Sequence, residues 1–259
     1  MAGLEDIKLR PRFFDALAPA DQIRDILDRI AMKVSIIIVA AGSGSRLGKS
    51  EPKAFVPVAG RPMLFHTLRT IAGLSEVVEA VIAVPAGMES HAREVCREAA
   101  IEMPVKITAG GAERQNSVRI ALALTSVEAD VVAVHDAARP LAGAELFERC
   151  IAGAARTGAA IAAMPVSDTL KREGSDRIIA ATVARAGLWS AQTPQAFRRG
   201  ILVAAHERAA RDAVAATDDA DLVERLGGRV ELIESSSRNI KITTASDLEI
   251  AEAIFERKS

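Results

Sequence analysis

The stretch that decides the fold is Ser35–Lys53, SIIIVAAGSGSRLGKSEPK, in which a β-branched apolar run leads directly into a glycine-rich loop. Such a loop after a buried strand commonly binds phosphate, because its backbone N–H groups can approach the anion. Two familiar phosphate motifs each fail here by one residue. Ser43 replaces the first glycine of the P-loop pattern G-x-x-x-x-G-K-[ST], and Leu47 replaces the last glycine of the dinucleotide pattern G-x-G-x-x-G.

The residues after the loop exclude both motifs, because each motif needs a helix whose first N–H groups hold the phosphates. Pro52, Pro57 and Gly60 follow within a few residues, and proline removes a donor and disfavours helix in the residue before it. The run VVAVHD, which ends at Asp136, imitates a Walker B strand, but an apolar strand followed by Asp is too common to restore the P-loop. We therefore expect an extended segment in which side chains supply the positive charge.

Beyond the loop, apolar β-branched runs alternate with helical patterns. The predicted strands are Val34–Ala40, Val77–Val84, Val105–Thr108, Val131–His135 and Ala159–Pro165. The predicted helices between them are Pro62–Leu74, Ser90–Ala100, Glu113–Leu124 and Ala144–Thr157. Continuous apolar strands separated by helices predict an α/β, Rossmann-like, mostly parallel sheet with helices on both faces. Ligands of such sheets bind beyond the carboxyl ends of the strands.

The region 167–195 interrupts this rhythm with turn signals and no helical stripe, so it predicts a projecting β-arm used in dimerisation. Helical patterns at Arg198–Ala215 and Asp218–Leu226, a strand at Val230–Glu234 and a helix at Ala245–Phe255 complete one domain, residues 33–259. Residues 1–32 predict a separate extension, which is either a peripheral helix or sequence upstream of a natural start at Met32.

The composition excludes several classes of function. A chain of 259 residues with 49% hydrophobic and 26% charged residues is typical of a soluble globular protein. Its net charge of -1 does not suit a nucleic-acid binder, and no apolar run approaches the ~20 residues of a membrane span. Cys96 and Cys150 are far apart, which predicts buried thiols rather than a disulfide or a zinc site. Without an apolar signal segment, we expect a cytoplasmic protein.

The motifs together resemble one family, the 2-C-methyl-D-erythritol 4-phosphate cytidylyltransferases of the non-mevalonate isoprenoid pathway. The resemblance covers roughly Val34–Phe255 and rests on seven segments that occur in the family's order: AAGSGSRLGKSEPKAFVPVAGRPML, GGAERQNSV, VHDAARP, DTLKR, LWSAQTPQAF, TDDA and NIKIT. It implies that methylerythritol phosphate attacks the α-phosphate of CTP and releases pyrophosphate. It also implies a divalent cation such as Mg²⁺, and a homodimer with shared active sites.

The resemblance further implies a role for each matching residue. The catalytic cations are Arg46, Lys53 and Lys241. The implied substrate-binding residues are Ala41, Gly42 and Gly44 in the glycine loop, Gly110, Gly111 and Ser117 around cytosine, Asp136 and Arg139 near the sugar and phosphates, and Thr169, Arg185, Thr193 and Thr217 on the acceptor side. Arg185 has a counterpart that reaches in from the neighbouring subunit, and Asp136 is the candidate ligand for Mg²⁺. Two departures are Ala112 and Ala184, where relatives often carry an acidic residue.

The residue types suit this chemistry. A phosphate monoester is already ionised near neutral pH, so the attacking group needs no general base. The barrier lies in bringing two anions together and in stabilising the charge that develops on the leaving pyrophosphate. Arginine and lysine are therefore required more than a catalytic triad, and only His135 of the four histidines lies near a candidate loop.

Three other functions compete with this one. Ribitol-5-phosphate cytidylyltransferases share the glycine loop, HDAxRP and QTPQ, but generally lack the arm motif found at Asp168–Arg172 and Leu188–Trp189. A nucleotide-binding module without catalysis would be expected to have lost basic residues, yet Arg46, Lys53 and Lys241 are all present. A P-loop ATPase or kinase is the third alternative.

Overall fold

The computed structural model describes residues 32–42, 44, 47 and 51–257, and these form a seven-stranded sheet in the order β11-β7-β10-β6-β1-β4-β5. Strand β10 (Trp189–Arg198) runs antiparallel to both of its neighbours, whereas the other pairings are parallel. The parallel strands are β1 (Val34–Val39), β4 (Val77–Val84), β5 (Val105–Ala109), β6 (Val131–Asp136), β7 (Ala159–Pro165) and β11 (Glu231–Glu234). The predicted mostly parallel sheet is confirmed.

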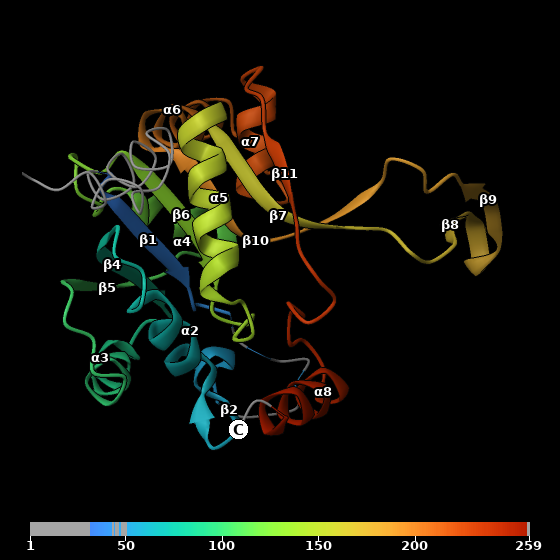
Figure 1. Ribbon diagram of the computed structural model, residues 1–259. Coiled ribbons are helices and arrows are strands. Elements are labelled where there is room, and N and C mark those ends of the chain that lie inside the picture. The colour runs from blue at the N-terminus through green and yellow to red at the C-terminus, as the bar shows by residue number, and fades with distance from the viewer. Residues whose placement is uncertain (1–31, 43, 45–46, 48–50, 258–259) are drawn as a thin grey trace, which may run out of the picture.

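Helices cover both faces of this sheet (Figure 1), as predicted. One face carries α2 (Met63–Ile71), α3 (Glu89–Glu98) and α5 (Ala144–Thr157), and the other carries α4 (Arg114–Leu122), α6 (Arg199–Arg211) and α7 (Asp219–Arg225). Because side chains alternate along a strand, Ile36 and Ile38 enter the first core while Ile37 enters the second. Helix α6 ends four residues before the predicted Ala215 because Ala213 takes a left-handed backbone conformation.

No helix follows the glycine loop in the described residues. The chain instead makes a single 3-10 turn, η3 (Lys53–Phe55), and a short hairpin of β2 (Pro57–Val58) and β3 (Arg61–Pro62), which the sequence analysis did not predict. Phe55 is buried at 1% exposure and anchors this turn in the core. A third apolar cluster joins the hairpin to α8 (Ala245–Glu256). The exclusion of the P-loop and dinucleotide motifs is thus confirmed.

The arm projects from the sheet as a two-stranded hairpin (Figure 1), in which β8 (Leu170–Glu173) pairs with β9 (Ile179–Val183) through the turn η4 (Ser175–Arg177). The predicted boundary of 167–195 is too long at its end. Trp189 already pairs with Pro165 of β7, so residues 189–195 belong to the central sheet. This strand was overlooked because it contains Pro194, which argues against a strand in the middle of a sheet.

Residues 1–31 of the predicted extension lie outside the described residues, while Met32 packs against the first core. Cys150 is buried, Cys96 is half-buried, and both are free thiols, as predicted. Burial raises the pKa of Cys96 to about 11 and that of Cys150 to about 12, which makes both thiols poor nucleophiles. Within the described part of the chain, no helix has both the length and the apolar character needed to cross a membrane.

Candidate functional site

A cavity of about 430 Å³ lies at the carboxyl ends of β1 and β6, where the sequence analysis expected a ligand site. The glycine loop, η3, the start of α4 and the segment after residue 240 enclose it. Eight of the predicted site residues line it: Ala41, Gly42, Gly44, Lys53, Gly111, Ser117, Asp136 and Lys241. Its polar lining suits an anionic, hydrophilic ligand.

The glycine loop brings Lys53 to the wall of the cavity. Gly44 has a φ of +72°, and a Cβ on it would lie 3.1 Å from both the Cβ and the backbone nitrogen of Lys53. The Lys53 N–H donates to the carbonyl of Gly42 at 3.3 Å, so the chain folds back over the loop. A residue other than glycine at position 44 would push Lys53 away. Arg46, the second predicted catalytic cation of this loop, lies outside the described residues.

A second loop packs directly against the first. A Cβ on Gly110 would lie 2.4 Å from the Cβ of Ala41 and 2.8 Å from Oγ of Ser117. The Gly111 N–H donates to Oγ of Ser117 at 3.1 Å, and that hydroxyl in turn donates to the carbonyl of Glu113 at 3.1 Å. Gly110 lies just behind the lining and sets the closeness of the two loops, whereas Gly111 and Ser117 face the cavity.

Asp136 ends β6 and carries the negative charge at the base of the cavity. Its side chain is 8% exposed; Oδ1 accepts from Nε of Arg114 at 3.0 Å and Oδ2 lies 2.6 Å from Nζ of Lys241. Burial alone would raise the pKa of this carboxyl, but Arg114 and Lys241 outweigh burial and hold the pKa well below its usual range. Asp136 is therefore ionised throughout the physiological pH range.

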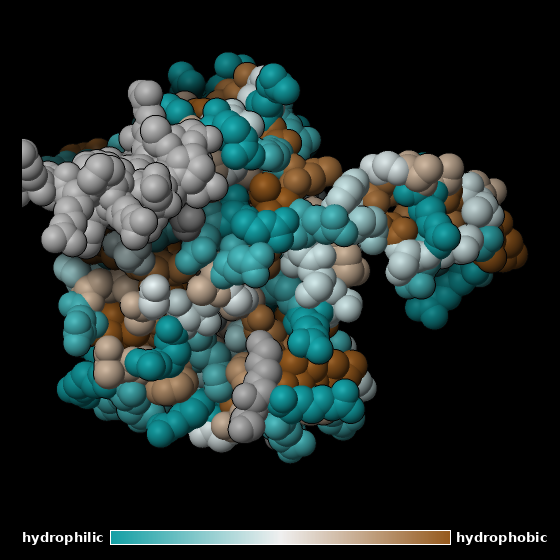
Figure 2. Space-filling view, viewed as in Figure 1, coloured by the Kyte–Doolittle hydropathy of each residue, from teal (hydrophilic) through white to brown (hydrophobic). Residues whose placement is uncertain are grey.

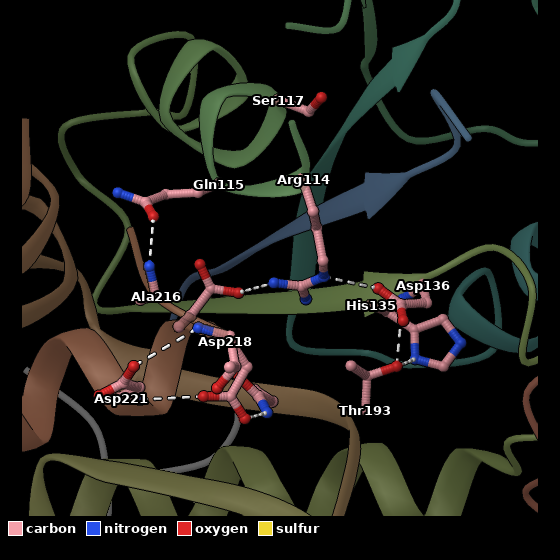
Figure 3. Close-up of polar contacts among 12 residues, drawn as sticks. Arg114, Gln115, Ser117, His135, Asp136, Thr193, Ala216, Asp218 and Asp221 are labelled. Atoms are coloured by element: carbon pink, nitrogen blue, oxygen red, sulfur yellow. Dashed lines mark hydrogen bonds and ion pairs between the residues drawn. The ribbon is translucent and has the colours of Figure 1, made fainter. Parts of the chain in front are cut away.

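Arg114 is a site residue that the sequence analysis missed. It is the first residue of α4, and its side chain reaches from that helix toward Asp136 (Figure 3). Its second partner is Asp219 on α7, whose Oδ2 lies 2.7 Å from Nη1. The only signal in the sequence was its place inside GGAERQNS, directly after the glycine pair. Thr243 also lines the cavity and was not predicted.

Lys241 is held at the cavity by its neighbours on the chain. The Ile242 N–H donates to the carbonyl of Ala138 at 2.9 Å, and the Ile242 side chain is fully buried in the third apolar cluster. Asn239 donates from its side-chain amide to Gln192 at 2.8 Å. Because side chains alternate along this extended segment, burying Ile242 leaves Lys241 on the opposite side, with its side chain 40% exposed in the cavity.

Thr193 and Arg139 lie behind the cavity wall rather than on it. The Asp136 N–H donates to Oγ1 of Thr193 at 3.1 Å, and that hydroxyl lies 3.1 Å from Nδ1 of His135 (Figure 3). Complete burial lowers the pKa of His135 to about 4, so the ring is neutral. Its Nδ1 then accepts a hydrogen bond from the Thr193 hydroxyl, and its Nε2–H donates to the carbonyl of Arg139 at 3.2 Å. Nη1 of Arg139 donates to the carbonyl of Asn239 at 2.6 Å. These contacts fix the backbone on either side of Asp136.

The remaining predicted residues do not reach the cavity within one subunit. Thr169 and Arg185 are exposed on the arm, and neither belongs to the lining. Thr217 is exposed before α7, where its N–H donates to Asp221 at 3.4 Å. One chain thus brings together eight of the residues expected around the nucleotide, but none of those expected around the acceptor lines the cavity.

The carboxylates of the site suit a metal ion that is also bound by the phosphates of a nucleotide. Among the described residues no group of three or more His, Cys, Asp or Glu side chains is arranged to hold a metal ion. Asp136 and Glu113 are the acidic residues of the described lining. Mg²⁺ is commonly held by one or two carboxylates together with substrate phosphates, so a single carboxylate here suits Mg²⁺ that arrives with a nucleotide.

Comparisons with known proteins show the family to which the chain belongs. The family model of 2-C-methyl-D-erythritol 4-phosphate cytidylyltransferase (IspD) matches residues 34–257. The cytidylyltransferase of that name from Syntrophotalea carbinolica is 44% identical over 229 residues, which cover 87% of this chain and 97% of the relative. The one from Pelotomaculum thermopropionicum is 41% identical over 227 residues, covering 87% and 95%.

A solved structure supports the same conclusion. The crystal structure of 2-C-methyl-D-erythritol 4-phosphate cytidylyltransferase from Thermus thermophilus superposes with a TM-score of 0.73 at 36% identity, covering 87% of this chain and 100% of that one. Sequence and fold therefore agree, and the chain belongs to the 2-C-methyl-D-erythritol 4-phosphate cytidylyltransferase family.

Proposed function

We propose that this chain transfers the cytidylyl group of CTP to 2-C-methyl-D-erythritol 4-phosphate, a step of isoprenoid precursor synthesis. The products are 4-diphosphocytidyl-2-C-methyl-D-erythritol and pyrophosphate. The observation that carries the proposal is the cavity in which Lys53, Lys241 and the Asp136–Arg114 pair converge at the carboxyl ends of β1 and β6. The family to which the chain belongs supports the same reaction.

The reaction forms one bond and breaks one bond at the α-phosphorus of CTP. An oxygen of the acceptor phosphate attacks, and the bond to the bridging oxygen of the β-phosphate breaks as pyrophosphate leaves. No proton has to move, since the attacking oxygen is already ionised. Lys53, Arg46 and Lys241 supply positive charge, and their attraction for the phosphates strengthens as negative charge develops on the leaving group.

Lys241 has to change partners for this role. In the structure its ammonium lies against Oδ2 of Asp136, whereas the carboxylate's other oxygen is held by Arg114. Lys241 is 40% exposed on a flexible side chain, and a phosphate can replace Asp136 as the partner of its ammonium. Its departure frees Oδ2 of Asp136 for a ribose hydroxyl or for Mg²⁺. A bound Mg²⁺ would neutralise part of the phosphate charge.

The nucleoside belongs on the side of the second loop. Gly111 and Ser117 present backbone and hydroxyl groups there, and the close contact of Gly110 with Ala41 keeps this end narrow. Such a turn can offer donors and acceptors to a pyrimidine edge and leaves little room for a purine. Ala112 has no polar side chain, so backbone groups of this loop carry the recognition.

The acceptor site is completed by a second copy of the chain. Thr169 and Arg185 stand on an arm that projects from its own subunit, and their side chains are exposed. Figure 2 shows apolar surface on that arm, where Ile178 and Ile179 are 66% and 60% exposed. Burial of these side chains against a second copy would stabilise a homodimer, and in our proposal Arg185 then reaches the partner's cavity. We assign the enzyme to the cytoplasm, where its two free cysteines stay reduced.

The experiment that tests this proposal measures pyrophosphate release from CTP with methylerythritol phosphate. Lys53→Ala should abolish turnover, because its charge acts on the transferred phosphate. Arg185→Ala should raise the KM for methylerythritol phosphate while CTP binding stays intact. Arg211→Ala, at the exposed end of α6, is the matched control and should behave as wild type. Wild-type protein that binds CTP but releases no pyrophosphate with Mg²⁺ would refute the enzyme and favour a nucleotide-binding module.

A further inference from the structure

A chain of buried charges continues behind Asp136, away from the cavity. Arg114 is clamped between Asp136 and Asp219, and Asp219 is in turn contacted by Nε2 of His206 at 3.0 Å. The side chains of Asp219 and His206 are 1% and 2% exposed, so both lie in the core of the α6–α7 face. Buried charged groups are costly unless they are paired, and this arrangement therefore demands a reason beyond packing.

His206 is oriented to serve Asp219. Burial alone would raise the pKa of Asp219, but Arg114 and His206 outweigh it and lower that pKa, so the carboxylate is ionised. Nε2 of His206 must then carry the ring hydrogen and donate a hydrogen bond to Oδ1 of Asp219. The other ring nitrogen, Nδ1, is buried and has no hydrogen-bond partner among the described residues. The histidine thus leaves one of its own groups unsatisfied in order to hold Asp219.

The two cations on Asp136 differ in mobility. Arg114 has a side chain that is 24% exposed and is fixed by carboxylates at both ends of its guanidinium, whereas Lys241 is 40% exposed and has one such partner. When Lys241 moves to the nucleotide, Arg114 remains as the permanent partner of Asp136. Because Nη1 of Arg114 is bound to Asp219, the guanidinium then has a second contact that limits its rotation.

We infer that Asp219, supported by His206, is a positioning residue for nucleotide binding that acts through Arg114. It holds Arg114 so that Asp136 keeps a fixed orientation toward the nucleoside after Lys241 has left. This inference rests on the proposed function, because it assigns CTP to the cavity. Asp219 itself does not line the cavity, so its effect on the substrate is indirect.

The first test is Asp219→Asn, with Asp212→Asn at the exposed end of α6 as the matched control. We expect the KM for CTP, and the CTP dissociation constant measured by calorimetry without acceptor, to rise about tenfold in Asp219→Asn. The KM for methylerythritol phosphate should stay within about twofold of wild type, and Asp212→Asn should match wild type. An equal rise in both KM values would mean a general structural defect and would overturn the inference.

A double-mutant cycle with Arg114→Gln tests whether Asp219 acts through Arg114. The double variant should bind CTP no more weakly than Arg114→Gln alone, because the effect of Asp219 is already lost in that variant. Free-energy losses that simply add would overturn the inference. A wild-type protein without cytidylyltransferase activity would instead refute the proposed function. Failure of the inference about Asp219 and failure of the proposed function are therefore distinguishable.

His206 offers a second pair of variants in case Asp219→Asn does not fold. His206→Leu removes the donor to Asp219 and leaves Oδ1 of a buried carboxylate unsatisfied, so it should lower the melting temperature and weaken CTP binding. His206→Gln retains an N–H donor and should bind CTP close to wild type. Equal CTP affinity in the two His206 variants would overturn the role of this hydrogen bond.

Discussion

Gly42→Ala isolates what the glycine loop contributes to nucleotide binding. Gly42 lines the cavity, and a Cβ built on it has no heavy atom of the described residues within 4 Å. Its φ lies outside the left-handed region, so an alanine causes no backbone strain and meets no neighbour in the described part of the chain. The added methyl group occupies only the space that we assign to the triphosphate. The substitution therefore separates folding from binding.

The two expected magnitudes differ in sign and size. The free energy of unfolding should stay within about 0.5 kcal/mol of wild type or rise by up to about 1 kcal/mol, since alanine restricts the unfolded chain. The methyl group keeps a phosphate oxygen from the backbone N–H groups of the loop, and a hydrogen bond to a charged group contributes about 1.5–3 kcal/mol. At about 1.4 kcal/mol per factor of ten, CTP affinity should fall roughly 10- to 150-fold.

Calorimetric titration with CTP and thermal unfolding measure both quantities on one preparation. Gly200→Ala is the control, because Gly200 lies in α6, also has no heavy atom within 4 Å of an added Cβ, and does not line the cavity. That variant should keep or gain stability and bind CTP as wild type does. Wild-type CTP affinity in Gly42→Ala would refute the claim that the loop binds phosphate through close backbone approach.

Three further predictions concern the residues around the cavity and the arm. Burial lowers the folded-state pKa of His135 to about 4, so the unfolded chain takes up a proton first as the pH falls. The free energy of unfolding should therefore drop by about 3 kcal/mol between pH 6.5 and 4. Urea unfolding of His135→Gln should show a smaller drop over this range, and a drop equal to that of wild type would contradict the role of His135. Gly110→Ala places a Cβ 2.4 Å from the Cβ of Ala41, so it should lower the free energy of unfolding by about 1–3 kcal/mol and weaken CTP binding. Urea unfolding and calorimetry measure these two quantities, and wild-type values for both would contradict the close packing of the two loops. Ile178→Asp combined with Ile179→Asp should give a monomer with weakened acceptor use, and a dimer that persists in sedimentation would refute the role of the arm.

The sheet could be predicted because its strands are marked by local composition. The run around Ile36–Ile38 is apolar at every position, as a strand buried on both faces requires, and the helices between such runs show their own period. Strand β10 was missed for the opposite reason. Pro194 interrupts its pattern, so its place between β6 and β7 depends on long-range pairing that local composition does not reveal.

The site divides in the same way. The place of Gly42, Lys53 and Asp136 at one cavity could be predicted because each lies in a segment that resembles the family. Arg114 and Asp219 were missed although they lie in the segments GGAERQNSV and TDDA, because their significance lies in a contact between residues 105 positions apart in the sequence. A charged residue at the start of a helix is usually solvated, and only the fold shows that this one is enclosed between two carboxylates.

Competition between two acceptors tests the central claim most directly. The protein is given CTP and Mg²⁺ with equal concentrations of 2-C-methyl-D-erythritol 4-phosphate and ribitol 5-phosphate, and the products are identified by mass spectrometry. We predict that 4-diphosphocytidyl-2-C-methyl-D-erythritol forms in large excess, together with pyrophosphate. Preferential formation of the ribitol product, or hydrolysis of CTP without transfer to either acceptor, would contradict the proposed cytidylyl transfer to methylerythritol phosphate.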